Sequence, residues 1–193
     1  VETTADGTYE LLTTTRQPFV GLSLPSGYVI PRNPTGTARL YRPLNPGRGG
    51  EAEATFELAP LGGSDEDHAF LVLADIQTQD AQEMAWFHEQ SVPDVQQTIR
   101  DLGDMHTFGV ADGDIMFDDL SLYPEFERGV ERMGIPFFQV VGNHDLDQEQ
   151  GTDEASTTTF EGRFGPRYYS FDRGAVHYVV LDDVLWHGSG YIG

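Results

Sequence analysis

Hydrophobic residues along this chain gather in short runs, and beyond residue 63 these runs alternate with stretches that have helical spacing. Three runs predict buried strands, because each is almost entirely apolar and is bounded by polar or turn-forming residues: 70–74, 108–111 and 135–141. Two stretches predict amphipathic helices, one starting at Pro93 and ending before Gly103, the other spanning 124–133. Strands alternating with helices predict an α/β fold.

The pattern differs at the two ends of the chain. Residues 168–172 and 175–181 flank Arg173-Gly174, which predicts a β-hairpin. In residues 1–63, three short alternating segments are separated by turns rich in proline and glycine, at 19–24, 38–41 and 54–58. This spacing predicts a small all-β sandwich domain over 1–63, followed by a second domain over 64–193.

Composition narrows the chemistry. The chain has 193 residues, no cysteine, no lysine and a net charge of −21. Without cysteine, any metal must be held by oxygen and imidazole groups. So strong a negative charge argues against non-specific nucleic-acid binding, and we interpret most of it as a solvated acidic surface like that of halophilic proteins. No apolar stretch approaches the roughly 20 residues that cross a bilayer, so no membrane span is expected.

Polar residues that suit metal chemistry follow each predicted parallel strand. Asp75 follows the first strand, Asp114 the second, and Asn143, His144 and Asp145 the third. Ligands of open α/β sheets bind beyond the carboxyl ends of the strands, and carboxylate and amide oxygens are hard donors for divalent cations. We therefore predict metal-assisted attack on phosphorus. His144 would act as general acid or stabilise charge on a phosphoryl oxygen, and Asp145 could accept a hydrogen bond from its imidazole.

These residues resemble the motifs of the calcineurin-like metallophosphoesterases: Asp75-Ile-Gln77, Gly113-Asp114 and Gly142-Asn-His-Asp145, in order. The resemblance implies an α+β sandwich, represented here by its N-terminal half and preceded by a β-sandwich domain. It also implies a dinuclear centre with two divalent metal ions (Mn, Fe, Zn or Mg), held in part by Asp75, Gln77, Asp114 and Asn143. The implied reaction is hydrolysis of a phosphate mono- or diester by a metal-activated hydroxide.

The sequence departs from the family pattern at two places. Gln77 stands where the family usually has a histidine, and the downstream histidine motifs are absent, so we expect a chain that stops before them. An alternative is therefore a non-catalytic carbohydrate- or cell-surface-binding module with a degraded metal site. Because the chain starts at Val1 and not at Met, we expect a leader to have been removed and the protein to be exported.

Near the second motif, Asp118 and Asp119 have a simpler interpretation. Acidic residues at this spacing after a strand are typical of turns and helix caps, and we favour that interpretation over metal ligation.

Overall fold

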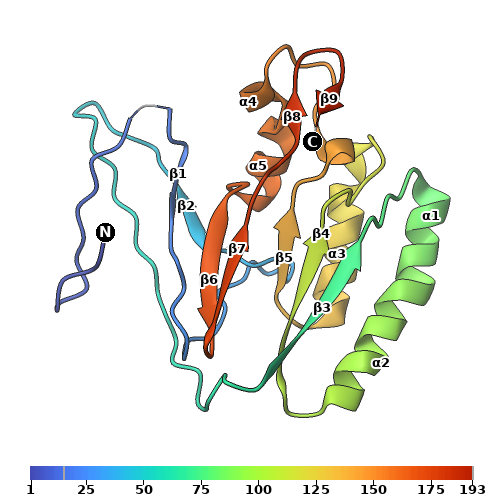
Figure 1. The fold of residues 1–193 in the computed structure, drawn as a ribbon, viewed down its shortest axis with the longest axis horizontal. Coiled ribbons are helices and arrows are strands. Elements are labelled where there is room, and N and C mark those ends of the chain that lie inside the picture. The colour runs from blue at the N-terminus through green and yellow to red at the C-terminus, as the bar shows by residue number, and fades with distance from the viewer. Residues whose placement is uncertain (15, 193) are drawn as a thin grey trace.

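The centre of the structure, a computed structural model that describes residues 1–14 and 16–192, is a parallel three-stranded sheet with the order β3-β4-β5. The strands are β3 (His68–Ala74), β4 (His106–Asp112) and β5 (Phe137–Val140). They coincide with the three hydrophobic runs, so the predicted α/β fold is confirmed. Because the strands are parallel, their carboxyl ends meet at one edge of the sheet, the upper edge in Figure 1.

Helices make both connections within this sheet. Between β3 and β4 lie α1 (Ala81–Trp86), a π-helical turn η1 (Phe87–Ser91) and α2 (Val92–Leu102); between β4 and β5 lies α3 (Tyr123–Met133). Both predicted helices are confirmed, and each ends before a glycine with positive φ, Gly103 and Gly134. The preceding helix α1 was not predicted. It begins where the side chain of Asp80 accepts hydrogen bonds from two backbone N–H groups of the first turn.

Different layers cover the two faces of the sheet, as Phe137 and Phe138 illustrate. Phe137 lies in a core that it shares with helix residues such as Phe126 and Val130. The side chain of Phe138 points to the other face, as alternation along a strand requires, and stacks on Phe171 with ring centroids 4.0 Å apart. The sheet is thus packed between a helical layer and a β layer, the sandwich that the sequence predicts.

The β layer contains the predicted hairpin, formed by β6 (Tyr169–Arg173) and β7 (Val176–Val180). Its turn is Gly174-Ala175, one residue later than expected, because Arg173 still pairs with Val176. Arg173 is buried and forms an ion pair with the buried Asp65, with 3.2 Å between its Nη1 and Oδ2 of Asp65. This pair fastens the hairpin to the segment that leads into β3.

The described residues of the segment 1–63 contain one two-stranded antiparallel sheet, formed by β1 (Phe19–Gly21) and β2 (Tyr41–Pro43). The third expected strand, 54–58, is wrong: it has no partner along its length, and only Pro60 forms an isolated bridge, to Tyr28. Residues between β1 and β2 pack on the sandwich. The backbone N–H of Ala38 donates to the carbonyl of Phe137, and Leu24 and Leu40 share a core with Phe138. The domain boundary at residue 63 stays a prediction.

The remaining elements lie in the segments that follow the strands β4 and β5, or in the last part of the chain. They are η2 (Leu120–Leu122), η3 (Asn143–Asp145), α4 (Asp153–Ser156), α5 (Thr158–Phe164), β8 (Leu185–Trp186) and β9 (Tyr191–Ile192). Within the described residues, none of the helices has the length and apolar character that a membrane crossing requires.

Candidate metal centre

The three strand-end loops meet at Asp114, which follows β4, the middle strand of the sheet. Its backbone carbonyl accepts a hydrogen bond from the N–H of Gln77 at 2.9 Å, and its Oδ1 accepts one from the N–H of His144 at 3.0 Å. Its Oδ2 accepts a third from the side-chain amide of Gln77, which also lies 3.5 Å from Oδ1 of Asp75. The structure therefore brings together Asp75, Gln77, Asp114 and His144, as the sequence predicts.

Asn143 lies beside this group as the first residue of the turn η3, between Gly142 and His144. It is half-buried, whereas Asp75 is exposed and Asp114 is buried. Asp112, which ends β4, is also exposed and lies two residues before Asp114. Candidate oxygen donors thus range from the core to the solvent at this edge of the sheet.

The backbone of the site is held in an unusual conformation. Among the described residues, the non-glycine residues with positive φ are all in these loops: Asp75 (50°), Gln77 (47°), Asp114 (44°) and Asp118 (68°). Such a conformation costs about 1–3 kcal/mol per residue and persists only where the surroundings impose it. Its concentration at one sheet edge is typical of a functional site.

Gly142 allows the loop after β5 to approach the loop after β4 closely at Asp114. A Cβ atom at Gly142 would lie 2.2 Å from both the backbone N and the Oδ1 of Asp114. Only glycine fits at this distance. The glycine of the third motif is therefore a packing requirement of the site and not simply a turn residue.

Asp145 is fully buried below these loops. Its carboxylate accepts four hydrogen bonds of 3.0–3.1 Å, from the backbone N–H groups of Ile115, Met116 and Gly142 and from the hydroxyl of Tyr123. Burial raises its pKa to about 6, although these hydrogen bonds oppose the shift. The predicted hydrogen bond between Asp145 and the imidazole of His144 is wrong, because all four donors hold this carboxylate in the core. Asp145 instead joins the second motif to the third.

The partner of the imidazole is Asp118. Nδ1 of His144 lies 2.8 Å from Oδ1 of Asp118, and the ring of Phe117 stacks on the imidazole with centroids 4.1 Å apart. Asp119 accepts a hydrogen bond from the N–H of Ser121 and caps η2, so the cap interpretation is confirmed for Asp119 only. The sequence signal for Asp118 was its place in a doublet of aspartates, where one residue caps and the other is free to turn toward the site.

Comparison with known proteins agrees with this geometry. A family model described as calcineurin-like phosphoesterase matches residues 68–189, which is more than half of the chain. The chain belongs to the calcineurin-like phosphoesterase family. No curated protein and no solved structure gave a significant match.

The donor chemistry of this calcineurin-like phosphoesterase chain fits a hard divalent cation, and the family typically uses divalent metals. Asp75 and Asp114 supply carboxylates, and Gln77 and Asn143 supply amide oxygens, the donors that Mg²⁺ and Mn²⁺ prefer. The amide nitrogen of Gln77 faces Asp114, so rotation of this amide would present its oxygen instead. Within residues 1–14 and 16–192, no group of three or more His, Cys, Asp or Glu side chains is arranged so that it could hold a metal ion.

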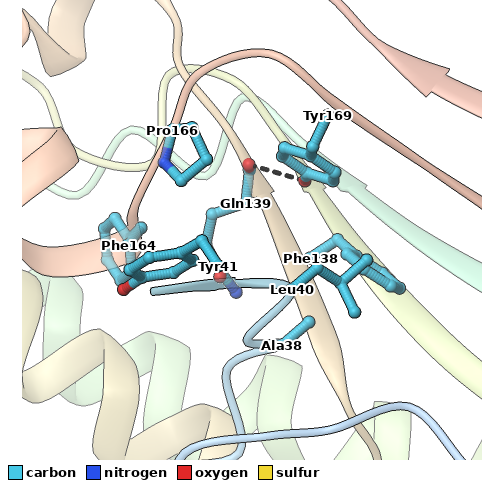
Figure 2. Close-up of a pocket in the computed structure, with 8 residues that line it drawn as sticks. All are labelled: Ala38, Leu40, Tyr41, Phe138, Gln139, Phe164, Pro166 and Tyr169. Carbon is cyan, nitrogen blue, oxygen red and sulfur yellow. Dashed lines mark hydrogen bonds between the residues drawn. The ribbon is translucent and has the colours of Figure 1, made fainter. Parts of the chain in front are cut away.

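A small pocket elsewhere in the chain does not compete with this site as a substrate pocket. It lies between the N-terminal segment, β5 and the start of β6, where the Tyr169 hydroxyl donates to the carbonyl of Gln139 (Figure 2). Its volume is about 20 Å³, which is room for a water molecule and not for a phosphate ester. None of the predicted site residues lines it.

Proposed function

We propose that this chain hydrolyses phosphate mono- or diesters at a dinuclear centre, with Asp75, Gln77, Asp114 and Asn143 among the ligands. The observation that carries this proposal is the convergence of the three strand-end loops on Asp114. When bound, divalent cations would supply Lewis-acid activation of water and of the phosphoryl group. The strained backbone holds the donor oxygens in place before any substrate binds.

His144 is the proposed proton donor to the leaving-group oxygen. Its Nδ1 is paired with the carboxylate of Asp118, which fixes the ring orientation and leaves Nε2 as the nitrogen that faces a substrate. Stacking on Phe117 further restricts rotation of the ring. Proton transfer by a positioned side chain contributes about 10²–10⁴-fold to a rate, and we expect His144 to contribute a rate factor of this size.

The surroundings of the site favour cations over anions. In the part of the chain that the structure describes, the hydrogen bonds and ion pairs of Asp75, Asp114, Asp118 and His144 involve no arginine. Phosphate charge would be neutralised chiefly by the bound metals. Export of the protein and adaptation of its acidic surface to high salt stay predictions.

The proposed role of His144 is tested with Mn²⁺-loaded protein and two diesters, one with phenyl and one with p-nitrophenyl leaving groups. His144→Ala should lower kcat by about 10²–10⁴-fold for the phenyl ester. It should lower kcat much less for the p-nitrophenyl ester, because p-nitrophenolate leaves without protonation. His106→Ala is the matched control, since His106 begins β4 at the opposite end of the sheet.

The rates on the two esters test the role of His144 and the enzyme assignment separately. Equal losses on both esters would remove the role of general acid from His144 while leaving the enzyme assignment intact. A wild-type chain that binds Mn²⁺ but hydrolyses neither ester would favour the binding-module alternative, for which Gln77 in the place of a histidine is the supporting feature.

A further inference from the structure

The β8–β9 hairpin reaches the site from the far end of the chain and is firmly attached there. The indole N–H of Trp186 donates to the carbonyl of Gln150 at 2.6 Å, and its backbone N–H donates to Asp153 at 2.8 Å. Trp186 is buried and belongs to the same core as the helices. In Figure 1 the hairpin lies above the carboxyl ends of the sheet, next to the loop that follows the third motif.

The register of this hairpin decides which side chains face the protein. Trp186 pairs with Tyr191, and Leu185 pairs with Ile192. Side chains of directly paired residues lie on the same face, so Tyr191 shares the inward face with the buried Trp186. Leu185 and Ile192 are on the other face, and both are exposed.

Tyr191 is thereby placed beside the proposed proton donor. Its ring centroid is 6.5 Å from that of His144, with an angle of 64° between the planes, and the residue remains 47% exposed. Phe117 stacks on the same imidazole from a different loop. Two aromatic rings from separate segments therefore adjoin the group that would protonate the leaving oxygen, and neither ring is needed to fill the core.

We propose that Tyr191 and Phe117 form a subsite for the leaving group of the ester, and that Tyr191 gives it a preference for uncharged aromatic groups. The inference rests on the proposed function. The imidazole is paired with the carboxylate of Asp118, and among the described residues no arginine hydrogen-bonds to either side chain, so an anionic leaving group would be repelled, whereas a neutral ring would stack. Tyr191 is thus a specificity-determining residue for this reaction.

The experiment compares kcat/KM for benzyl phosphate and n-butyl phosphate with Mn²⁺-loaded protein. Both esters release a primary alcohol, so they make similar demands on acid catalysis and differ chiefly in the ring. Tyr191→Ala should lower the benzyl-to-butyl ratio by about 2- to 10-fold, the range expected for one aromatic contact. Tyr191→Phe should keep the ratio, and Ile192→Ala, on the opposite face of β9, is the control for damage to the hairpin.

Each other outcome overturns the inference in a recognisable way. A wild type that hydrolyses both esters without preference, or a ratio that survives Tyr191→Ala, would remove the subsite while leaving the phosphoesterase assignment in place. Equal losses on both esters in Tyr191→Ala would give Tyr191 a structural role only. Hydrolysis of neither ester by the wild type would instead refute the proposed function on which the subsite depends.

Discussion

Gly142→Ala is the substitution that tests most sharply whether the loops must meet at Asp114. The new methyl group would lie 2.2 Å from the backbone N and Oδ1 of Asp114, where ordinary contacts begin at 3.4 Å. The two loops would therefore have to separate by more than 1 Å. Both atoms belong to a buried residue whose neighbours are fixed by hydrogen bonds, so the strain cannot be relieved by turning a flexible side chain.

The size of the effect follows from this displacement. Overpacking of this kind destabilises a protein by about 1–3 kcal/mol, which corresponds to a fall in Tm of about 2–12 °C for a chain of this size. A misplacement of about 1 Å at a reacting centre costs about 100-fold in rate. We therefore expect a folded variant whose activity falls far more than its stability does.

The assay is Mn²⁺-dependent hydrolysis of a phenyl phosphodiester, with thermal unfolding followed in parallel by circular dichroism. Gly162→Ala is the matched control: a Cβ atom there meets nothing within 4 Å, and Gly162 lies in the helix α5. That variant should keep its activity and gain about 0.5–1 kcal/mol of stability. Wild-type kcat in Gly142→Ala, at unchanged Tm, would refute the claim that the close approach builds the site.

Two further predictions concern one carboxylate of the site and one carboxylate of the core. Asp118→Asn removes the charged partner of the His144 imidazole, and we expect kcat to fall about 10- to 100-fold with little change in KM. Steady-state kinetics measure this effect, with Asp119→Asn as the control. An unchanged kcat would contradict the proposed orientation of the ring. Asp65→Asn leaves the guanidinium of Arg173 buried without its partner, which should lower the free energy of unfolding at pH 7 by about 3–5 kcal/mol in urea titrations. Burial disfavours the charged form of Asp65, but hydrogen bonds from Gly27 and Ser26 and the Arg173 ion pair outweigh it and hold its pKa well below the ordinary 3.8. The stabilisation is therefore complete above pH 3.8 and disappears as the pH falls below it, so the two proteins should converge in acid, and a constant difference down to pH 2 would show that ionisation of Asp65 is not its source.

The sequence predicted the parts of the fold that depend on periodicity. The runs that became β3, β4 and β5 are mostly apolar because the sheet packs between two layers, although Phe70 and Val72 of β3 stay half-exposed. Gly103 and Gly134 end helices by a local mechanism. Residues 54–58 alternate like a strand but find no partner, because pairing depends on tertiary contacts that a local pattern does not contain.

The site shows the same division between local and tertiary information. Asp114 and His144 could be placed at one sheet edge because parallel strands end together. The partner of the imidazole could not be chosen, because Asp145 is its neighbour in sequence while Asp118 is its neighbour in space. Asp145 is not that partner, because four hydrogen-bond donors hold its carboxylate in the core. Those donors come from segments as far as 30 residues away.

Asp114 is the proposed metal ligand on which the three strand-end loops of this phosphoesterase converge. The most direct test is the rate of phosphodiester hydrolysis as Mn²⁺ is added to protein first stripped with a chelator, for the wild type and for Asp114→Asn. We expect no activity without metal, a saturable rise in the wild type, and loss of that rise in the variant. A wild-type rate that survives chelation, or an Asp114→Asn rate that rises with Mn²⁺ as the wild type does, would contradict the proposed role of Asp114.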